Sequence, residues 1–579
     1  MKKFKKALAC MIAAMTMCGA TACGGGNNNG GKTQLKVVIY EGGYGYDWVN
    51  QSIERFEAKY AEESFETGKK GVHVEVEHTK DTNVNTMNSS AYDLYFTNGA
   101  TPRDFSQKGW LVDINDIVTE KIDDRDGTQV SIEDKIDENY RIVLKNRGDG
   151  HYYGLPYADY YSGLTFDKEA FDARKWYFAA PEETAKTQYD SPYGTGYFIT
   201  TDEAKKSCGL DGVYGTPDDG LPTSLTELLI LCSRIKQGGY VPFAFPGGHK
   251  NYGNLLFTGL WASLAGYDEI RAGFDYTGEV EVVTGFSDEQ LFKGIDYIKK
   301  PTTKKVGLTE AEGYYSTQTA ARYYAYAFMQ ICEEEGFFAN ISRDDNVSHT
   351  ATMGRFLTNG LTDQEKIAML IEGSYWYNEA SDNGEVKKYQ VLKQKQTGEK
   401  DAQKDVRWMP LPSSLDKSTE VNADGVRNKY TFTQSGSSFA VINARTKNKG
   451  DGVVNAAKKF LQFTYTDAEL SYRTGRHGVF CTGVTHPVYA EDSAKLNVFQ
   501  NSVIEAAQNA KLILPSAQNE TFMDARTDLK LDGKNFVSVI YQGREYWSVI
   551  NIIRSGINAK SLFELSEIDE SGWGSYYKG

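Results

Sequence analysis

Residues 35–49 read LKVVIYEGGYGYDWV, and this stretch decides the fold. Leu35–Tyr40 is an apolar run that predicts a buried strand, and Gly42–Asp47 after it is a glycine-rich turn. The next apolar residues recur at spacings of 4, 3 and 4, at Val49, Ile53, Phe56 and Tyr60. Such spacing is typical of one face of a helix. A strand, a turn and a helix therefore open the ordered part of the chain.

Two further strands follow this unit. Val72, Val74 and Val76 alternate with polar residues, and Tyr92–Thr97 forms a third apolar run. Strand–helix–strand units of this length predict a parallel sheet with right-handed crossovers. Ligands bind such sheets beyond the carboxyl ends of the strands, which here are residues 40–47 and 97–99. We therefore expect binding residues in these two turns.

Length and composition narrow the class of protein. The 579 residues carry a net charge of −14, which argues against nucleic acid or an anionic membrane as the ligand. A chain of this length exceeds a single hydrophobic core and predicts at least two lobes. Tyrosine is plentiful, at 38 against 28 Phe and 8 Trp, and its ring joins an apolar face to a polar tip. Surfaces that bind hydroxyl-rich ligands need that mixture.

The amino terminus has the pattern of a secretory leader. Lysines at positions 2, 3, 5 and 6 precede an apolar run over residues 7–18, and Ala20-Thr-Ala22 ends at Cys23. This arrangement resembles the lipobox of bacterial lipoproteins, in which the cysteine receives a diacylglycerol, although Ala20 stands where leucine is usual. The resemblance implies a signal peptide over residues 1–22 and lipidation of Cys23. Residues 23–33, rich in Gly and Asn, then predict a flexible linker.

Later segments predict a mixed α/β chain. Ser224 and Glu227 form a capping box for a helix that ends at Gly238. We also expect a long helix over residues 310–336, a strand and turn over 366–376, an exposed loop or edge over 383–406, a strand over 437–443 and a helix over 453–465. The mature cysteines other than Cys23 show no metal-type spacing, and one disulfide among them stays open: Cys208, Cys232, Cys332 and Cys481.

These landmarks, in this order, resemble the extracellular solute-binding proteins of ABC importers, in particular the large sugar-binding family. The motifs that carry the resemblance are Gly43–Trp48, Tyr92–Thr97, Gly154–Asp159, Leu221–Leu228, Ala368–Trp376, Ala456–Phe463 and Thr474–Gly475. The family implies an α/β fold of two lobes joined by hinge crossovers, with a ligand cleft between the lobes. We place the first lobe at residues 34–157 and 432–495 and the second at 158–431 and 496–579.

The resemblance also implies the function. It implies a receptor, not an enzyme, that is lipid-anchored to the bacterial cell membrane on its extracytoplasmic side. This receptor captures a carbohydrate, here an oligosaccharide, and passes it to the permease subunits of an ABC transporter. We expect a monomer that binds no nucleic acid and needs no cofactor.

A sugar-binding cleft needs aromatic faces for the C–H surfaces of the ring and short polar groups for its hydroxyls. Side chains of these types at the strand ends and crossovers are our candidate ligand contacts: Tyr44, Tyr46, Trp48, Asn98, Asp159, Tyr160, Tyr161, Trp261 and Trp376. For each of them, packing within the fold is the competing interpretation.

Two other sites and two other functions stay open. Asp211, Asp218 and Asp219 lie among glycines, where oxygen-rich loops can hold Ca²⁺, although an acidic turn is the simpler interpretation. A surface-anchored glycoside hydrolase needs two carboxylates across a cleft, which 78 acidic residues can supply, but no catalytic motif supports it. The same fold could also bind a peptide or another polar solute.

Overall fold

The computed structural model describes residues 28–98, 102–124, 127–136, 141, 144–146, 148–416, 431–481, 483–508, 510–513, 539–541, 544–546 and 548–573. Cys23 and the leader lie outside these residues, so cleavage and lipidation stay predictions. Of the expected linker, residues 28–31 form a 3₁₀ turn, and Thr33 already belongs to the first strand. None of the helices in the described residues is both long and apolar enough to cross a membrane.

One nine-stranded sheet runs through the molecule in the order β2-β1-β3-β14-β6-β12-β9, with β13 also paired to β6 and β15 to β14. Its strands are β1 (Thr33–Tyr40), β2 (Val72–Thr79), β3 (Leu94–Asn98), β6 (Leu155–Asp167), β9 (Val241–Ala244), β12 (Ile367–Gly373), β13 (Val406–Met409), β14 (Thr431–Ile442) and β15 (Lys511–Ile513). The predicted parallel pairing of β1 with β2 and with β3 is confirmed. β14 is antiparallel to both β3 and β6.

The described residues also form four two-stranded sheets that are separate from the nine-stranded one: β4 (Ile122–Asp123) with β5 (Gln129–Val130), β7 (Lys186–Ser191) with β8 (Gly194–Ile199), β10 (Glu279–Gln290) with β11 (Lys299–Gly307), and β16 (Val539–Tyr541) with β17 (Arg544–Tyr546). The longer helices are α2 (Trp48–Lys59), α8 (Leu225–Gln237), α9 (Gly253–Asp275), α10 (Ala320–Glu334), α11 (His349–Leu357), α13 (Glu385–Thr397), α14 (Asp451–Phe463), α15 (Asp467–His477), α17 (Val498–Gln508) and α20 (Ala559–Ser566).

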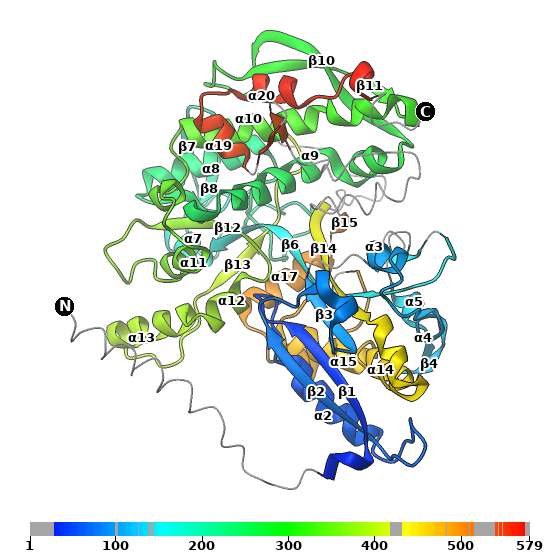
Figure 1. Cartoon of the computed structure of the whole chain (residues 1–579). Coiled ribbons are helices and arrows are strands. Elements are labelled where there is room, and N and C mark those ends of the chain that lie inside the picture. The colour runs from blue at the N-terminus through cyan, green and yellow to red at the C-terminus, as the bar shows by residue number, and fades with distance from the viewer. Residues whose placement is uncertain are drawn as a thin grey trace, which may run out of the picture.

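Shorter helices complete the chain: α3 (Pro102–Gln107), α4 (Asn115–Thr119), α5 (Ile132–Lys135), α7 (Lys168–Arg174), α12 (Trp376–Asp382), α16 (Ala490–Ser493), α19 (Val549–Arg554) and α21 (Glu570–Trp573). The 3₁₀ segments are η1 (Asn28–Gly31), η2 (Val84–Ser89), η3 (Gly247–Tyr252), η4 (Glu310–Thr317), η5 (Asn340–Arg343) and η6 (Ala444–Lys449). The C-terminal helices α19 and α20 return to pack on α10, as the red and green ribbons of Figure 1 show.

The fold is α/β with two lobes, each around its own core. The first core takes its side chains from residues 35–158 and 439–484, and the second from residues 164–411 and 549–563. β6 passes from one core to the other, since Leu155 lies in the first and Leu164 in the second. Figure 1 shows β6 and β14 crossing between the lower blue part and the upper green part. A third cluster, which includes Trp376 and Phe499, packs β12, α12 and α17 together.

Most predicted elements are present, and two expectations are wrong. The expected loop at 383–406 contains α13, which begins after Gly384 and ends before Gly398, both at φ +80°. Its Glu, Lys, Gln and Leu residues are strong helix formers, but only Tyr389 is buried, so this surface helix has the polar composition of a loop and no apolar face to distinguish it. The expected helix over 310–336 is divided, because Thr319 is extended between η4 and α10.

Of the two hydrogen bonds in the predicted capping box at Ser224, the structure shows the one that the Ser224 side chain accepts. The Ser224 hydroxyl accepts a hydrogen bond from the Glu227 amide at 3.2 Å, as a cap should. The Glu227 carboxylate accepts instead from the amide and hydroxyl of Thr223, both at 2.8 Å. The four cysteines of the described residues are free thiols.

Candidate functional site

The carboxyl ends of strands from both lobes point toward one region. β6 is antiparallel to β12 and to β14, and β14 is antiparallel to β3, so β1 and β12 run in opposite directions. β9 runs parallel to β12. The turn after β1 therefore faces the segments that follow β12 and β9. Ligands of α/β sheets bind beyond such ends.

We call this region, where the turn after β1 faces the segments that follow β12 and β9, the junction. Five tyrosines form an aromatic cluster there: Tyr40, Tyr44, Tyr160, Tyr252 and Tyr375. The Tyr44 ring is stacked on Tyr160 at 6.1 Å between ring centroids, and it meets Tyr375 edge-on at 5.5 Å. Tyr160 and Tyr375 are also edge-to-face, at 5.0 Å. Tyr40 lies 6.3 Å from Tyr44, and the Tyr375 hydroxyl donates to that of Tyr252 at 3.2 Å. Each ring is half-buried, so the cluster joins both lobes and the crossover strand without being sealed.

Two glycines allow the segments that carry these rings to lie close together. A Cβ on Gly373, the last residue of β12, would lie 2.4 Å from the Tyr375 ring and 2.9 Å from the Tyr160 ring. A Cβ on Gly43, in the turn after β1, would lie 3.1 Å from both Tyr375 and Glu379. The two lobes therefore touch through glycine backbone, which leaves the space between them to aromatic rings.

Carboxyl groups lie among these rings. Glu372 is 0% exposed at the end of β12, and burial, followed by the charge of Glu379, raises its pKa well above the ordinary value. Glu379 on α12 holds His349, with Oε1 3.1 Å from Nε2, and this hydrogen bond raises the pKa of His349. His349 is stacked on Tyr252 at 6.5 Å. Burial and the charge of Glu372 raise the phenol pKa of Tyr252 and of Tyr375.

Asn378 on α12 ties the second lobe to the first. Its Nδ2 lies 3.3 Å from the carbonyl oxygen of Tyr44, 3.0 Å from that of His477 and 3.3 Å from that of Gly478. Its Oδ1 accepts from Nε2 of Gln500 at 2.8 Å. One amide thus connects the turn after β1, the end of α15 and α17 across the junction.

The structure brings together some of the predicted ligand contacts and not others. Tyr44 and Tyr160 are in the aromatic cluster. Tyr46 is half-buried beside it, edge-on to His78 at 5.2 Å, and Asn98 is half-buried at the end of β3. These four lie on the segments where the sequence placed the site.

The three predicted tryptophans lie in the cores. Trp48 is 1% exposed and packs on Phe96, with the Arg473 guanidinium over its ring. Trp261 is 3% exposed on α9. Trp376 is 0% exposed, and its Nε1 donates to Thr165 Oγ1 at 3.0 Å. The structure does not bring any of them to the aromatic cluster, because their helices turn these apolar faces inward.

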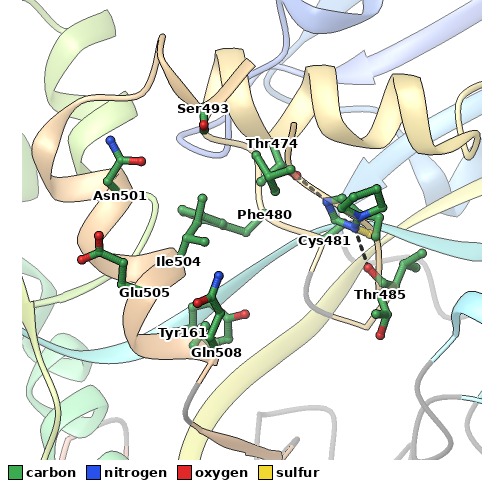
Figure 2. A pocket seen from close by; sticks show the side chains of 15 residues that line it. Tyr161, Thr474, Phe480, Cys481, Thr485, Ser493, Asn501, Ile504, Glu505 and Gln508 are labelled. Carbon is green, nitrogen blue, oxygen red and sulfur yellow. Dashed lines mark hydrogen bonds between the residues drawn. The ribbon is translucent and has the colours of Figure 1, made fainter. Parts of the chain in front are cut away.

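Asp159 and Tyr161 lie on the other side of β6 from Tyr160, since successive strand residues face opposite ways. Asp159 is buried, and its amide donates to the carbonyl of Phe480 at 2.8 Å. Tyr161 lines a cavity of about 560 Å³ between the 474–493 segment and α17. Figure 2 shows Asn501, Ile504, Glu505 and Gln508 of α17 on one side and Thr474 and Cys481 on the other.

Several polar groups in the wall of this cavity are hydrogen-bonded within the fold. His486 contacts Thr474 Oγ1 through Nε2 at 3.0 Å and donates to the Val484 carbonyl through Nδ1 at 2.6 Å. Burial lowers the pKa of His486 to about 4, so the ring is neutral near pH 7. The Cys481 thiol donates to the Pro156 carbonyl at 3.0 Å, and burial raises its pKa to about 12.

The carboxylates of the predicted calcium loop serve the loop itself. Asp218 accepts from the amides of Leu210 and Asp211 and from the Thr216 hydroxyl. Asp219 accepts from Gly215, and Asp211 from Val213. Nowhere in the described residues do three or more His, Cys, Asp or Glu side chains gather in a way that could hold a metal ion. The loop has the hydrogen bonds of an acidic turn.

Sequence reasoning missed Tyr252, Glu372, Tyr375, Glu379 and His349. Two signals were available. Tyr375 and Glu379 are four residues apart at the start of α12, and Gly247-Gly-His-Lys-Asn-Tyr252 directly follows β9. The exact residue at which α12 begins decides whether Tyr375 or Trp376 faces the junction, and a sequence pattern does not fix that residue.

The sequence matches no protein-family model and no curated protein. Among solved structures, it is similar to a chitin oligosaccharide binding protein at 13% identity, with 88% of this chain and 97% of that chain covered and a TM-score of 0.46. A structure from work on xylan utilisation by the thermophilic bacterium Caldanaerobius polysaccharolyticus covers 92% and 99% at 12% identity, with a TM-score of 0.49. The solute receptor AcbH, described with an exclusive preference for β-D-galactopyranose, covers 94% and 98% at 13% identity, with a TM-score of 0.46.

Proposed function

We propose that this chain is an extracytoplasmic, lipid-anchored receptor that binds an oligosaccharide between its lobes and passes it to an ABC permease. The observation that carries the proposal is the aromatic cluster. Tyr44 comes from the turn after β1, Tyr160 from the crossover strand and Tyr375 from the segment after β12, and their half-buried rings meet at the junction. Tyrosine faces suit the C–H surfaces of sugar rings, and their hydroxyls suit the rim.

Closure of the lobes around the ligand follows from the same geometry. Tyr44 belongs to one lobe and Tyr375 to the other, so a ligand that touches both stabilises the closed arrangement over the open one. The hinge strands β6 and β14 absorb the change. The anchor and the permease are proposed from the leader and from the family resemblance.

Isothermal titration calorimetry with a panel of plant, host and starch-type oligosaccharides tests the proposal. We expect saturable binding to at least one of them, weakened at least tenfold by Tyr44→Ala. Tyr197→Ala is the matched control, because Tyr197 is 46% exposed on β8 and outside the cluster. Binding of peptides and of no sugar would overturn the proposal.

The anchor has a separate test in cells. Cys23→Ala is expected to release the protein into the medium or the soluble extracytoplasmic fraction, while the unchanged chain stays with the membrane. Membrane association that survives the substitution would refute lipidation at Cys23.

One observation keeps glycoside hydrolysis as a second candidate. Glu372 and Glu379 are two interacting carboxyl groups, and one of them has a raised pKa, as the general acid of a glycosidase requires. Incubation of each bound oligosaccharide with the protein, followed by chromatography, separates the two functions. A receptor returns the sugar intact, whereas an enzyme produces shorter products.

A further inference from the structure

The junction holds five carboxyl groups and few positively charged partners for them. Glu41, Asp47, Glu372, Glu379 and Asp382 lie on the segments around the aromatic cluster. The contact of Glu379 with His349 is the sole ion pair that any of these five carboxylates makes within the described residues. Burial and the charges of Asp47, Glu379 and Glu41 together raise the pKa of Asp382.

Glu372 is the most unusual of the five. Its side chain is fully buried, Oε2 accepts from the amide of the next residue, Gly373, at 3.2 Å, and Oε1 has no hydrogen-bond partner among the residues that the structure describes. In the same part of the chain, Oε2 of Glu379 is also buried without a hydrogen-bond partner. Leaving a buried acceptor unpaired costs about 1–3 kcal/mol, and more for a charged one. Native proteins retain such groups where a ligand or a reaction uses them.

The neighbours of Glu372 indicate which ligand group fits. Its charge acts on the phenols of Tyr252 and Tyr375, whose hydroxyls meet at 3.2 Å, and Glu379 acts on Glu372 itself. Tyr160 packs beside Tyr375 over Gly373. Tyrosine faces attract cations, and an ammonium group offers three donors and no acceptor. Unpaired carboxylate oxygens among tyrosine rings therefore complement an amine.

We propose that the junction recognises a protonated amine on its carbohydrate ligand, so that the preferred ligand is an amino sugar with a free amino group. Glu372 and Glu379 accept from the ammonium, whose positive charge stabilises the ionised form of the buried Glu372 carboxyl. The rings of Tyr160, Tyr252 and Tyr375 surround the ammonium. This inference rests on the proposed function, because the amine is carried by a sugar. Opening of the lobes moves Tyr44 away and lets the sugar reach the carboxylates.

Calorimetry with sugars matched at carbon 2 tests the inference. Each of the gluco, galacto and manno series is offered with a free amine, an N-acetyl group or a hydroxyl at that position, including β-1,4-linked oligomers of the gluco series. We expect the free amine to bind at least tenfold more tightly than its acetylated and hydroxyl counterparts in the series that fits. Neutral sugars that bind as well as the amine would overturn the inference and leave the proposed function standing.

Glu372→Gln separates the charge from the shape. We expect the variant to lose the preference for the amine and to bind the neutral counterpart as the unchanged protein does. If Glu372 instead acts as a neutral acid that donates to a sugar hydroxyl, Gln preserves binding of every sugar, and the inference fails. Glu269→Gln, which changes a carboxyl group on α9 outside the junction, is the control.

An amine without a sugar ring tests the proposed function and this inference together, and a second variant replaces Glu372→Gln if that protein does not fold. Binding of an amine without a sugar ring, with spermidine as the probe, together with no binding of any sugar would overturn both proposals. A Glu372→Gln protein that does not fold, judged by its thermal unfolding, is replaced by Glu379→Gln, for which the same loss of amine preference is expected. Retention of that preference in the folded Glu379 variant would contradict the role given to the carboxylate pair.

Discussion

Tyr160 and Tyr161 are neighbours on β6, yet they serve two different regions. Tyr160 faces the junction, where tyrosine rings meet two carboxyl groups that each keep one oxygen without a hydrogen-bond partner among the described residues. Tyr161 faces the cavity of Figure 2, where His486 and Cys481 are hydrogen-bonded to their own backbone or side-chain partners. Under the proposed function, the binding surface lies where buried carboxyl oxygens lack partners among the described residues, and not at the larger empty volume. We propose that the cavity side stabilises the fold and that the junction side binds the ligand.

Alanine at the two tyrosines should separate stability from binding. Tyr161 is buried, so Tyr161→Ala is expected to lower the free energy of unfolding by about 3–4 kcal/mol through a cavity left in the core. Tyr160→Ala should cost less than about 1 kcal/mol of stability but weaken sugar binding by at least tenfold. Urea unfolding and calorimetry on both variants give the two quantities. Equal effects of the two substitutions on binding would remove the distinction between the regions.

Burial of neutral His486 beside the cavity should make the free energy of unfolding depend on pH. The pKa of His486 is about 4 in the folded chain and about 6.5 in the unfolded chain, so the unfolded state binds more protons between these values. Stability is therefore full above about pH 6.5 and falls by about 3 kcal/mol as the pH drops to 4. His486→Gln is expected to remove this component of the slope. A slope unchanged by the substitution would show that His486 is not buried in its neutral form.

Loss of the Asn378 side-chain amide, which bridges the two lobes, should weaken sugar binding less than loss of the Tyr160 ring. Asn378→Ala removes the amide that contacts Tyr44, His477 and Gly478, and with it part of the contact between the lobes. We expect sugar affinity to fall by about threefold to tenfold, in line with about 1 kcal/mol for such a hydrogen bond. Small-angle scattering should show a larger radius of gyration in the absence of ligand. Asn359→Ala, near the far end of β12, provides a comparison outside the bridge.

The smallest expected effect concerns His349. Its bond to Glu379 raises its pKa, so the ion pair is complete below about pH 6.5 and is lost as the pH rises through the raised value. Proton NMR of the His349 ring should show this raised pKa, and Glu379→Gln should return it toward 6.5. A pKa that Glu379→Gln leaves unchanged would refute the contact.

The sequence predicted more of the fold than of the site. Hydrophobic spacing identified β1, α2, β2 and β3, because burial of one face dictates those patterns. It named Tyr44 in the turn after β1 and Tyr160 on the crossover strand, and the structure brings these two rings together. It could not choose Tyr375 over Trp376, because adjacent aromatic residues at a helix start differ only in the direction that the first turn gives them. Glu372 was also beyond reach, since it ends an otherwise apolar strand and its importance comes from neighbours distant in sequence.

The most direct test of the central claim is a crystal structure with the tightest-binding oligosaccharide of the panel. The account predicts a sugar ring against Tyr44, Tyr160 and Tyr375, with a polar group of the sugar within hydrogen-bond distance of Glu372 or Glu379. A sugar bound in the cavity beside Tyr161 and His486, with the tyrosine cluster unchanged, would contradict it.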